Sequence, residues 1–155
     1  MGMVDVMKKN FPRYKMYTLN MPSEGDHRLE LKEEYDNGLS VYYKFPGDAP
    51  ENPRSWDREG TIVELPDDTR LEFGYGYRTW TKVQLVITLV NRVGELKVTD
   101  SPDIIPINVA ISGKPAIASY LGAVHGLTPE ESSDYLDLSP ETIKQYRVDY
   151  KNGRR

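Results

Sequence analysis

The chain has 155 residues and a net charge of −4, which argues against a protein that coats nucleic acid through bulk electrostatics. It contains no cysteine and two histidines, so disulfides, thiolate catalysis and cysteine-ligated zinc are excluded, and we expect neither a metal nor another cofactor. No apolar run reaches the length of a membrane span, about 18 residues, and the N-terminus lacks the apolar stretch of a signal peptide, so we expect a cytoplasmic protein without a membrane partner.

The first part of the chain, from about Tyr14 to Thr99, is rich in β-branched and aromatic residues and in turn residues. His27–Tyr35 alternates apolar and polar residues, as a half-buried strand does. Asp36-Asn37-Gly38 comes next, and Asn-Gly accepts the positive φ angles of a type I′ turn. Leu39–Phe45 then supplies a partner strand. These residues predict a β-hairpin.

A second hairpin is predicted after a long loop. The loop covers Pro46–Gly60 and contains three prolines. Two short segments, Thr61–Leu65 and Thr69–Phe73, then flank the turn Pro66-Asp67-Asp68 as the strands of this hairpin.

Residues 79–93 are compatible with either a strand or a helix. Their β-branched content favours a strand, whereas their valines and isoleucine also form a helical stripe. We favour a strand, with a return strand at Glu95–Thr99. Pro102 and Pro106 then mark a boundary, so we predict an antiparallel β-rich domain of four to six strands over residues 1–106.

Residues 107–155 change to helical periodicity. Lys114–Val124 carries an apolar face, and Gly126 is suited to end that helix. Thr128-Pro129-Glu130-Glu131 then has an N-cap threonine, a proline at the first helical position and a glutamate at the third, which is a capping box. Ser139-Pro140-Glu141 repeats the cap and the proline.

The chain must turn sharply between the two helices that begin after Thr128 and Ser139. The first is predicted to end at Leu136, and only Asp137 and Leu138 lie between it and Ser139. Two helices joined by so short a turn, with a further helix in front, form a helix-turn-helix unit. The predicted fold class is therefore α+β, with the β-rich domain followed by a three-helix unit.

This segment resembles the helix-turn-helix families typified by sigma-factor region four and the LuxR-type response regulators, and also a motif of small archaeal regulators. The resemblance is carried by Leu127-Thr128-Pro129-Glu130 and by Ser139-Pro140-Glu141-Thr142-Ile143. Aligning the core of these families with Pro129–Val148 implies a small residue, Ser133, where the helices pack closely. It also implies core positions at Leu136, Leu138, Ile143 and Tyr146.

Two positions depart from the pattern of these families. Ser132 stands where they usually have an apolar residue, so its hydroxyl needs a hydrogen-bond partner. Asp137 stands where they usually have glycine, and aspartate is among the residues that best tolerate a left-handed backbone.

The resemblance implies that the helix from about Ser139 to Lys151 enters the major groove of DNA. Gln145 can pair with adenine and Glu141 can accept a hydrogen bond from cytosine, while Lys144, Arg147 and Lys151 suit phosphate contacts. We also expect Asp149 to point outward. The expected DNA-binding residues are Thr128, Ser139, Glu141, Thr142, Lys144, Gln145, Arg147, Lys151, Arg154 and Arg155.

Charge distribution agrees with a local anionic partner. Residues 139–155 carry five basic and two acidic side chains, so the rest of the chain is acidic. We therefore expect a sequence-specific double-stranded DNA-binding protein, a transcriptional regulator. A homodimer is expected, with the β-rich domain mediating dimerisation or effector sensing, because one helical unit buries little surface.

The sequence also bears on two other functions. A three-helix unit of this kind also serves as a protein-docking or structural module that does not bind DNA. An enzyme is not expected, because the sequence shows no nucleophile–base pair and no metal-ligand cluster that would supply catalytic residues.

Overall fold

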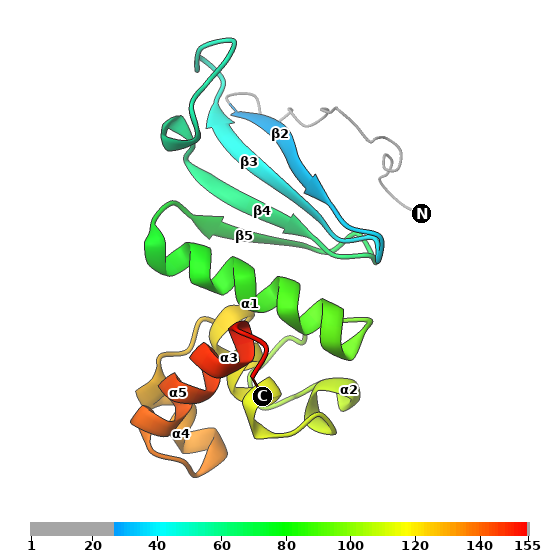
Figure 1. The fold of residues 1–155 in the computed structure, drawn as a ribbon, viewed down its shortest axis with the longest axis vertical. Helices are drawn as coiled ribbons and strands as arrows, with labels where there is room; N and C mark the ends of the chain where they lie inside the picture. Colours follow the sequence, from blue (N-terminus) through cyan, green and yellow to red (C-terminus); the bar gives the residue numbers. More distant parts are fainter. Residues whose placement is uncertain (1–26, 155) are drawn as a thin grey trace. The chain divides into compact units, whose positions relative to one another are not determined.

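The structure of the protein is a computed structural model that describes residues 27–154. It has the predicted α+β class, with a four-stranded antiparallel sheet followed by helices (Figure 1). The chain divides into two compact units, Met1–Thr79 and Trp80–Arg155. The expected β-rich texture between Tyr14 and Asp26, and the expected DNA contact Arg155, lie outside the described residues.

The sheet of the first unit has the strand order β2-β3-β4-β5, with antiparallel neighbours throughout. Its strands are β2 (His27–Glu34), β3 (Ser40–Pro46), β4 (Gly60–Glu64) and β5 (Arg70–Gly74). Both predicted hairpins are confirmed. Gly38 has a φ of 93° in the first turn and Asp68 a φ of 73° in the second. The first turn is not the predicted type I′, because Asn37 does not have a positive φ; the Gly38 amide donates to the Tyr35 carbonyl at 3.0 Å instead. The predicted loop joins β3 to β4 and contains the short 3-10 helix η2 (Ser55–Asp57).

The segment that we favoured as a strand is a helix, α1 (Tyr77–Val93). Its buried residues are Val83, Leu85, Val86, Leu89 and Val90, which recur at helical spacing. The β-branched side chains were therefore misleading, because burial of the 3.6-residue stripe outweighs the modest strand preference of valine.

The predicted return strand at Glu95–Thr99 is also wrong, since these residues have no regular secondary structure. Side chains take the place of a strand partner. The Tyr120 hydroxyl donates to the Lys97 carbonyl at 2.7 Å and accepts from the Thr99 amide at 3.0 Å. Because its backbone groups are bonded in this way, the segment needs no neighbouring strand.

The second unit continues with four helices after α1 (Figure 1). They are α2 (Ile107–Ala110), α3 (Lys114–Ala123), α4 (Pro129–Leu136) and α5 (Pro140–Lys151). α3, α4 and α5 contact one another, and α2 contacts α3. The division between the units falls between Thr79 and Trp80, before the predicted boundary near residue 106, because residues 80–93 join the helices. Within residues 27–154, no helix combines the length and apolar character needed to cross a membrane.

Candidate nucleic-acid interface

The helices α3, α4 and α5 share one hydrophobic cluster. Its buried members are Ala118 and Leu121 from α3, Leu136 from α4 and Ile143 from α5. Partly buried side chains surround them: Ile105, Ile117, Leu127, Leu138 and Tyr146. The four positions that the sequence predicted as core, Leu136, Leu138, Ile143 and Tyr146, therefore belong to this cluster. Burial of these side chains holds α5 against α3 and α4.

Both helix starts have the predicted caps. The Thr128 hydroxyl accepts from the Glu131 amide at 3.1 Å, and the Glu131 carboxylate accepts from the Thr128 amide at 2.9 Å, so the capping box is complete. At α5, the Ser139 hydroxyl accepts from the Thr142 amide at 3.2 Å and lies 2.9 Å from the Thr142 hydroxyl. Both caps satisfy backbone donors that a helix start leaves unpaired.

The turn between α4 and α5 uses the left-handed backbone that the sequence predicted. Asp137 has φ 56° and ψ 42°, and its amide donates to the Ser133 carbonyl at 3.0 Å. Only Leu138 and the capping Ser139 follow before α5 begins. The turn is thus two residues long with a cap, and it determines the direction of α5 relative to α4.

Arg147 differs from its predicted role, because its guanidinium faces inward. Its Nε donates to the Ala118 carbonyl of α3 at 2.8 Å, and its Nη2 donates to the Ser132 hydroxyl of α4 at 2.7 Å. Burial lowers the pKa of Arg147 to about 10, which leaves the side chain charged at neutral pH. Arg147 therefore joins the three helices and is not on the face of α5 that a ligand would meet.

Ser132 and Gly122 explain why the guanidinium fits there. Ser132 is 0% exposed, so the hydroxyl that departs from the apolar pattern finds its partner in Arg147. At Gly122 of α3, an added Cβ would lie 2.6 Å from Cζ and 2.7 Å from Nε of Arg147. The sequence carried this signal as a serine at a core position, together with a glycine inside the helix at Lys114–Ala123.

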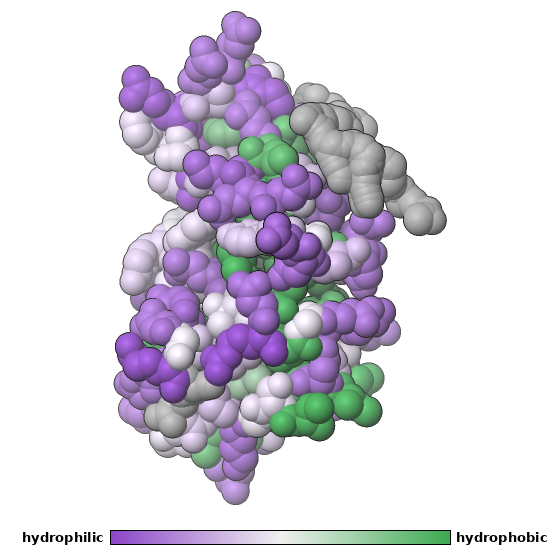
Figure 2. Space-filling model, turned by 45° about the vertical axis from the view of Figure 1, so that its right-hand side comes forward, coloured by the Kyte–Doolittle hydropathy of each residue, from purple (hydrophilic) through white to green (hydrophobic). Residues whose placement is uncertain are grey.

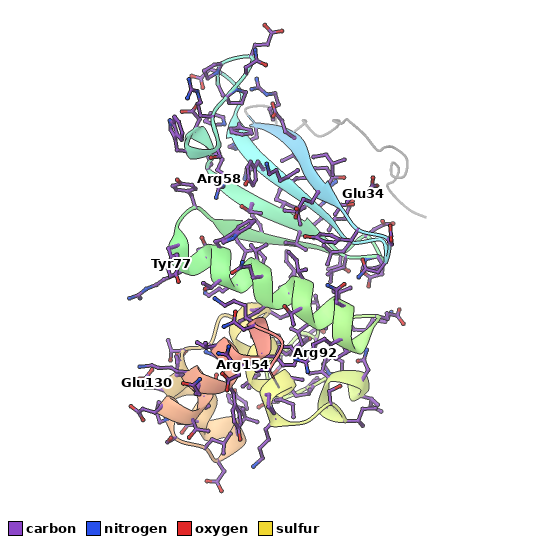
Figure 3. The ribbon with its side chains drawn as sticks, viewed as in Figure 1. Glu34, Arg58, Tyr77, Arg92, Glu130 and Arg154 are labelled. Carbon is purple, nitrogen blue, oxygen red and sulfur yellow. The ribbon has the colours of Figure 1, made fainter. Side chains whose placement is uncertain are left out.

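Asp149 is a second residue that the structure places differently from the prediction. It is 7% exposed, so its carboxylate does not project outward from α5. Its Oδ1 accepts from Gln145 Nε2 at 2.9 Å and from Arg154 Nη2 at 3.1 Å. Arg154 lies just beyond the end of α5 (Figure 3). Asp149 thus neutralises Arg154 and orients Gln145.

The outward side of α5 is formed by exposed side chains at helical spacing. They are Glu141, Lys144, Gln145 and Val148, and the half-buried Lys151 continues the row. We call these five residues the α5 stripe. Val148 was not singled out from the sequence, yet it is 44% exposed beside the polar residues. A valine three residues after Gln145 and four after Lys144 is the pattern that could have identified it.

The predicted site residues therefore divide into three groups. Glu141, Lys144, Gln145 and Lys151 lie together on the α5 stripe. Thr128, Ser139 and Thr142 are engaged in the helix caps, while Arg147 and Arg154 are bonded within the unit. The cationic character of the outward face is consequently carried by two lysines, fewer than the charge count of the sequence suggested.

Comparison of the chain with protein-family models, with curated proteins and with solved structures finds no match. The function is therefore inferred from the side chains of the helical unit alone.

Proposed function

We propose that the protein is a sequence-specific double-stranded DNA-binding protein, a transcriptional regulator that works in the cytoplasm as a homodimer. The observation that carries this proposal is the α5 stripe, on a helix whose direction is determined by a tight, capped turn after α4. A helix presented in this way fits the major groove, whose width admits one α-helix.

The α5 stripe carries side chains suited to reading base edges. The amide of Gln145 uses one N–H on Asp149, which leaves its second N–H and its oxygen to bind adenine in a bidentate manner. Val148 offers an apolar contact for the methyl group of thymine, and Glu141 accepts from the amino group of cytosine. The bond to Asp149 also limits the rotamers of Gln145, so less conformational entropy is lost on binding.

Phosphate contacts are assigned to the lysines of the α5 stripe. Lys144 is exposed beside Gln145, and Lys151 lies in the last turn of α5. Each lysine that neutralises a phosphate releases condensed counterions, so the affinity depends on salt concentration.

The test is binding of the full chain to labelled random-sequence duplexes at two salt concentrations. Lys144→Ala/Lys151→Ala is compared with Lys97→Ala, an exposed lysine of the same unit that lies outside α5. Binding should weaken with salt, and the α5 variant should flatten the salt slope by about two per protomer. Equal binding by the two variants, or no binding at low salt, would contradict the proposal.

The second candidate function is protein docking through the same stripe. It is favoured by the exposure of Val148 and by Tyr135 of α4, which is 46% exposed. Aromatic side chains are enriched in protein interfaces, whereas two lysines supply little electrostatic attraction for DNA. A protein partner released by Val148→Glu, from a chain that binds no duplex, would favour this function over DNA binding.

A further inference from the structure

Three isoleucines are exposed around α2, in the second unit. Ile104 is 56% exposed, Ile107 78% and Ile111 79%. Ile107 and Ile111 are four residues apart and lie on the same side of α2, and Ile104 belongs to the segment that leads into the helix. Figure 2 shows hydrophobic surface gathered over this part of the unit. We call these three residues the isoleucine patch.

The opposite side of α2 is firmly held. Val109 is fully buried, and the side-chain Nδ2 of Asn108 donates to the Val93 carbonyl at 3.2 Å and to the Glu95 carbonyl. Ser112 donates to the Asn108 carbonyl at 2.8 Å. Because these bonds orient α2, the isoleucine patch is exposed by a defined structure and not by a loose segment. Exposed apolar side chains that contribute nothing to the fold mark an interaction surface.

Charge around the isoleucine patch favours a second copy of this chain as its occupant. Residues 104–113 contain no ionisable side chain, although 28% of the chain is charged. A two-fold symmetric contact brings a surface onto itself, so any charge near its centre would meet the same charge on the other copy. An uncharged centre avoids this repulsion, whereas a charged partner would find nothing to pair with there.

Charges of opposite sign flank α2 at equal distances along the chain. Asp103 lies four residues before α2 begins and Lys114 lies four residues after α2 ends, and both are exposed. In an antiparallel contact of two copies of α2 about a two-fold axis, the end of the segment that carries Asp103 in one copy faces the end that carries Lys114 in the other, twice. The charges are therefore complementary for self-association in this one orientation.

We propose that the isoleucine patch is the dimerisation surface of the protein and that its occupant is the isoleucine patch of a second copy. Three isoleucines that are each more than half exposed give an apolar centre on the order of a few hundred Å². A standard interface buries about 800 Å² per partner, so the flanking polar residues form its rim. This inference deepens the proposed function, since the dimer would present two copies of α5, but it is argued without DNA.

The experiment is sedimentation equilibrium of the full chain without DNA, over a range of concentrations. The native chain should dimerise, and Ile107→Glu/Ile111→Glu should raise the dissociation constant roughly a hundredfold or more, because like charges would then meet in an apolar centre. Tyr77→Glu, at a side chain that is 81% exposed and outside the isoleucine patch, is the control and should leave the dimer intact. The helix content of each variant, measured by circular dichroism, should equal that of the native chain, because these isoleucines are exposed.

A charge exchange tests the orientation. Asp103→Lys and Lys114→Asp should each weaken the dimer, and the double variant should restore it, because the two pairs are then formed with reversed signs. A monomeric native chain would overturn the proposal and would show that another segment or partner covers the isoleucine patch. A dimer that persists in Ile107→Glu/Ile111→Glu would also overturn it. A dimer that binds no DNA would contradict only the proposed function.

Discussion

The two sides of α5 carry the same kinds of residue and use them differently. On the inward side, Arg147 bonds to α3 and α4, and Asp149 receives Arg154 and Gln145. On the outward side, Lys144 is exposed and is available to a ligand. A cation on a helix therefore contributes to binding only where its partners within the fold leave it free. A charge count along a sequence therefore overestimates the cationic surface of a helix such as this one.

The largest effect that separates the two sides is expected from Arg147→Ala. This change removes the donor to two buried acceptors, the Ala118 carbonyl and the Ser132 hydroxyl. The free energy of unfolding should fall by about 2–3 kcal/mol, because the two lost hydrogen bonds are only partly offset by the removal of a half-buried charge. Lys144→Ala, the matched change on the outward side, should stay within about 0.5 kcal/mol. Chemical denaturation of both variants measures their free energies of unfolding. Equal values would contradict the different roles of the inward and outward sides of α5.

A smaller effect is expected from Gly122→Ala. The added Cβ would lie 2.6 Å from the Arg147 guanidinium carbon, so the guanidinium must move from its two acceptors. The free energy of unfolding should fall by about 2 kcal/mol. In the Arg147→Ala background the space is open, so the same change should cost almost nothing. A double-mutant cycle measures this coupling, and additive losses would show that Gly122 serves another purpose.

The outward side should affect sequence preference and leave stability almost unchanged. Gln145→Ala removes the side chain that we assign to adenine, and this loss should reduce discrimination at one base pair by about 1–2 kcal/mol. Selection of duplexes from a random pool, followed by competition with single-base changes, measures the effect. A base preference identical to that of the native chain would show that Gln145 does not recognise a base.

Local patterns allowed much of this fold to be predicted. The hairpin turn at Asn37-Gly38 and the caps at Thr128 and Ser139 depend on neighbouring residues alone, so they could be derived from the sequence. The left-handed Asp137 was predicted for the same reason. Asp137 and the cap at Ser139 determine where α4 ends and α5 begins, so they also determine which residues form the α5 stripe.

The rest depended on contacts between distant residues. Residues 79–93 satisfy strand and helix patterns together, and burial of one helical face decided between them. Arg147 and Lys144 are equivalent by type, and their roles differ only because Ser132 and Gly122 leave room for a guanidinium. Such a pocket is built from two other helices, so sequence spacing along α5 cannot reveal it.

DNA binding by the outward side of α5 can be tested by a nuclear magnetic resonance titration of the isotope-labelled full chain with duplex DNA. We expect the amide signals of Glu141, Lys144, Gln145 and Val148 to shift first and to lose their shifts as salt is added. The amide signals of residues 27–74, which include the sheet, should shift far less. Shifts confined to the sheet, or no shifts at low salt, would show that the outward side of α5 does not bind DNA.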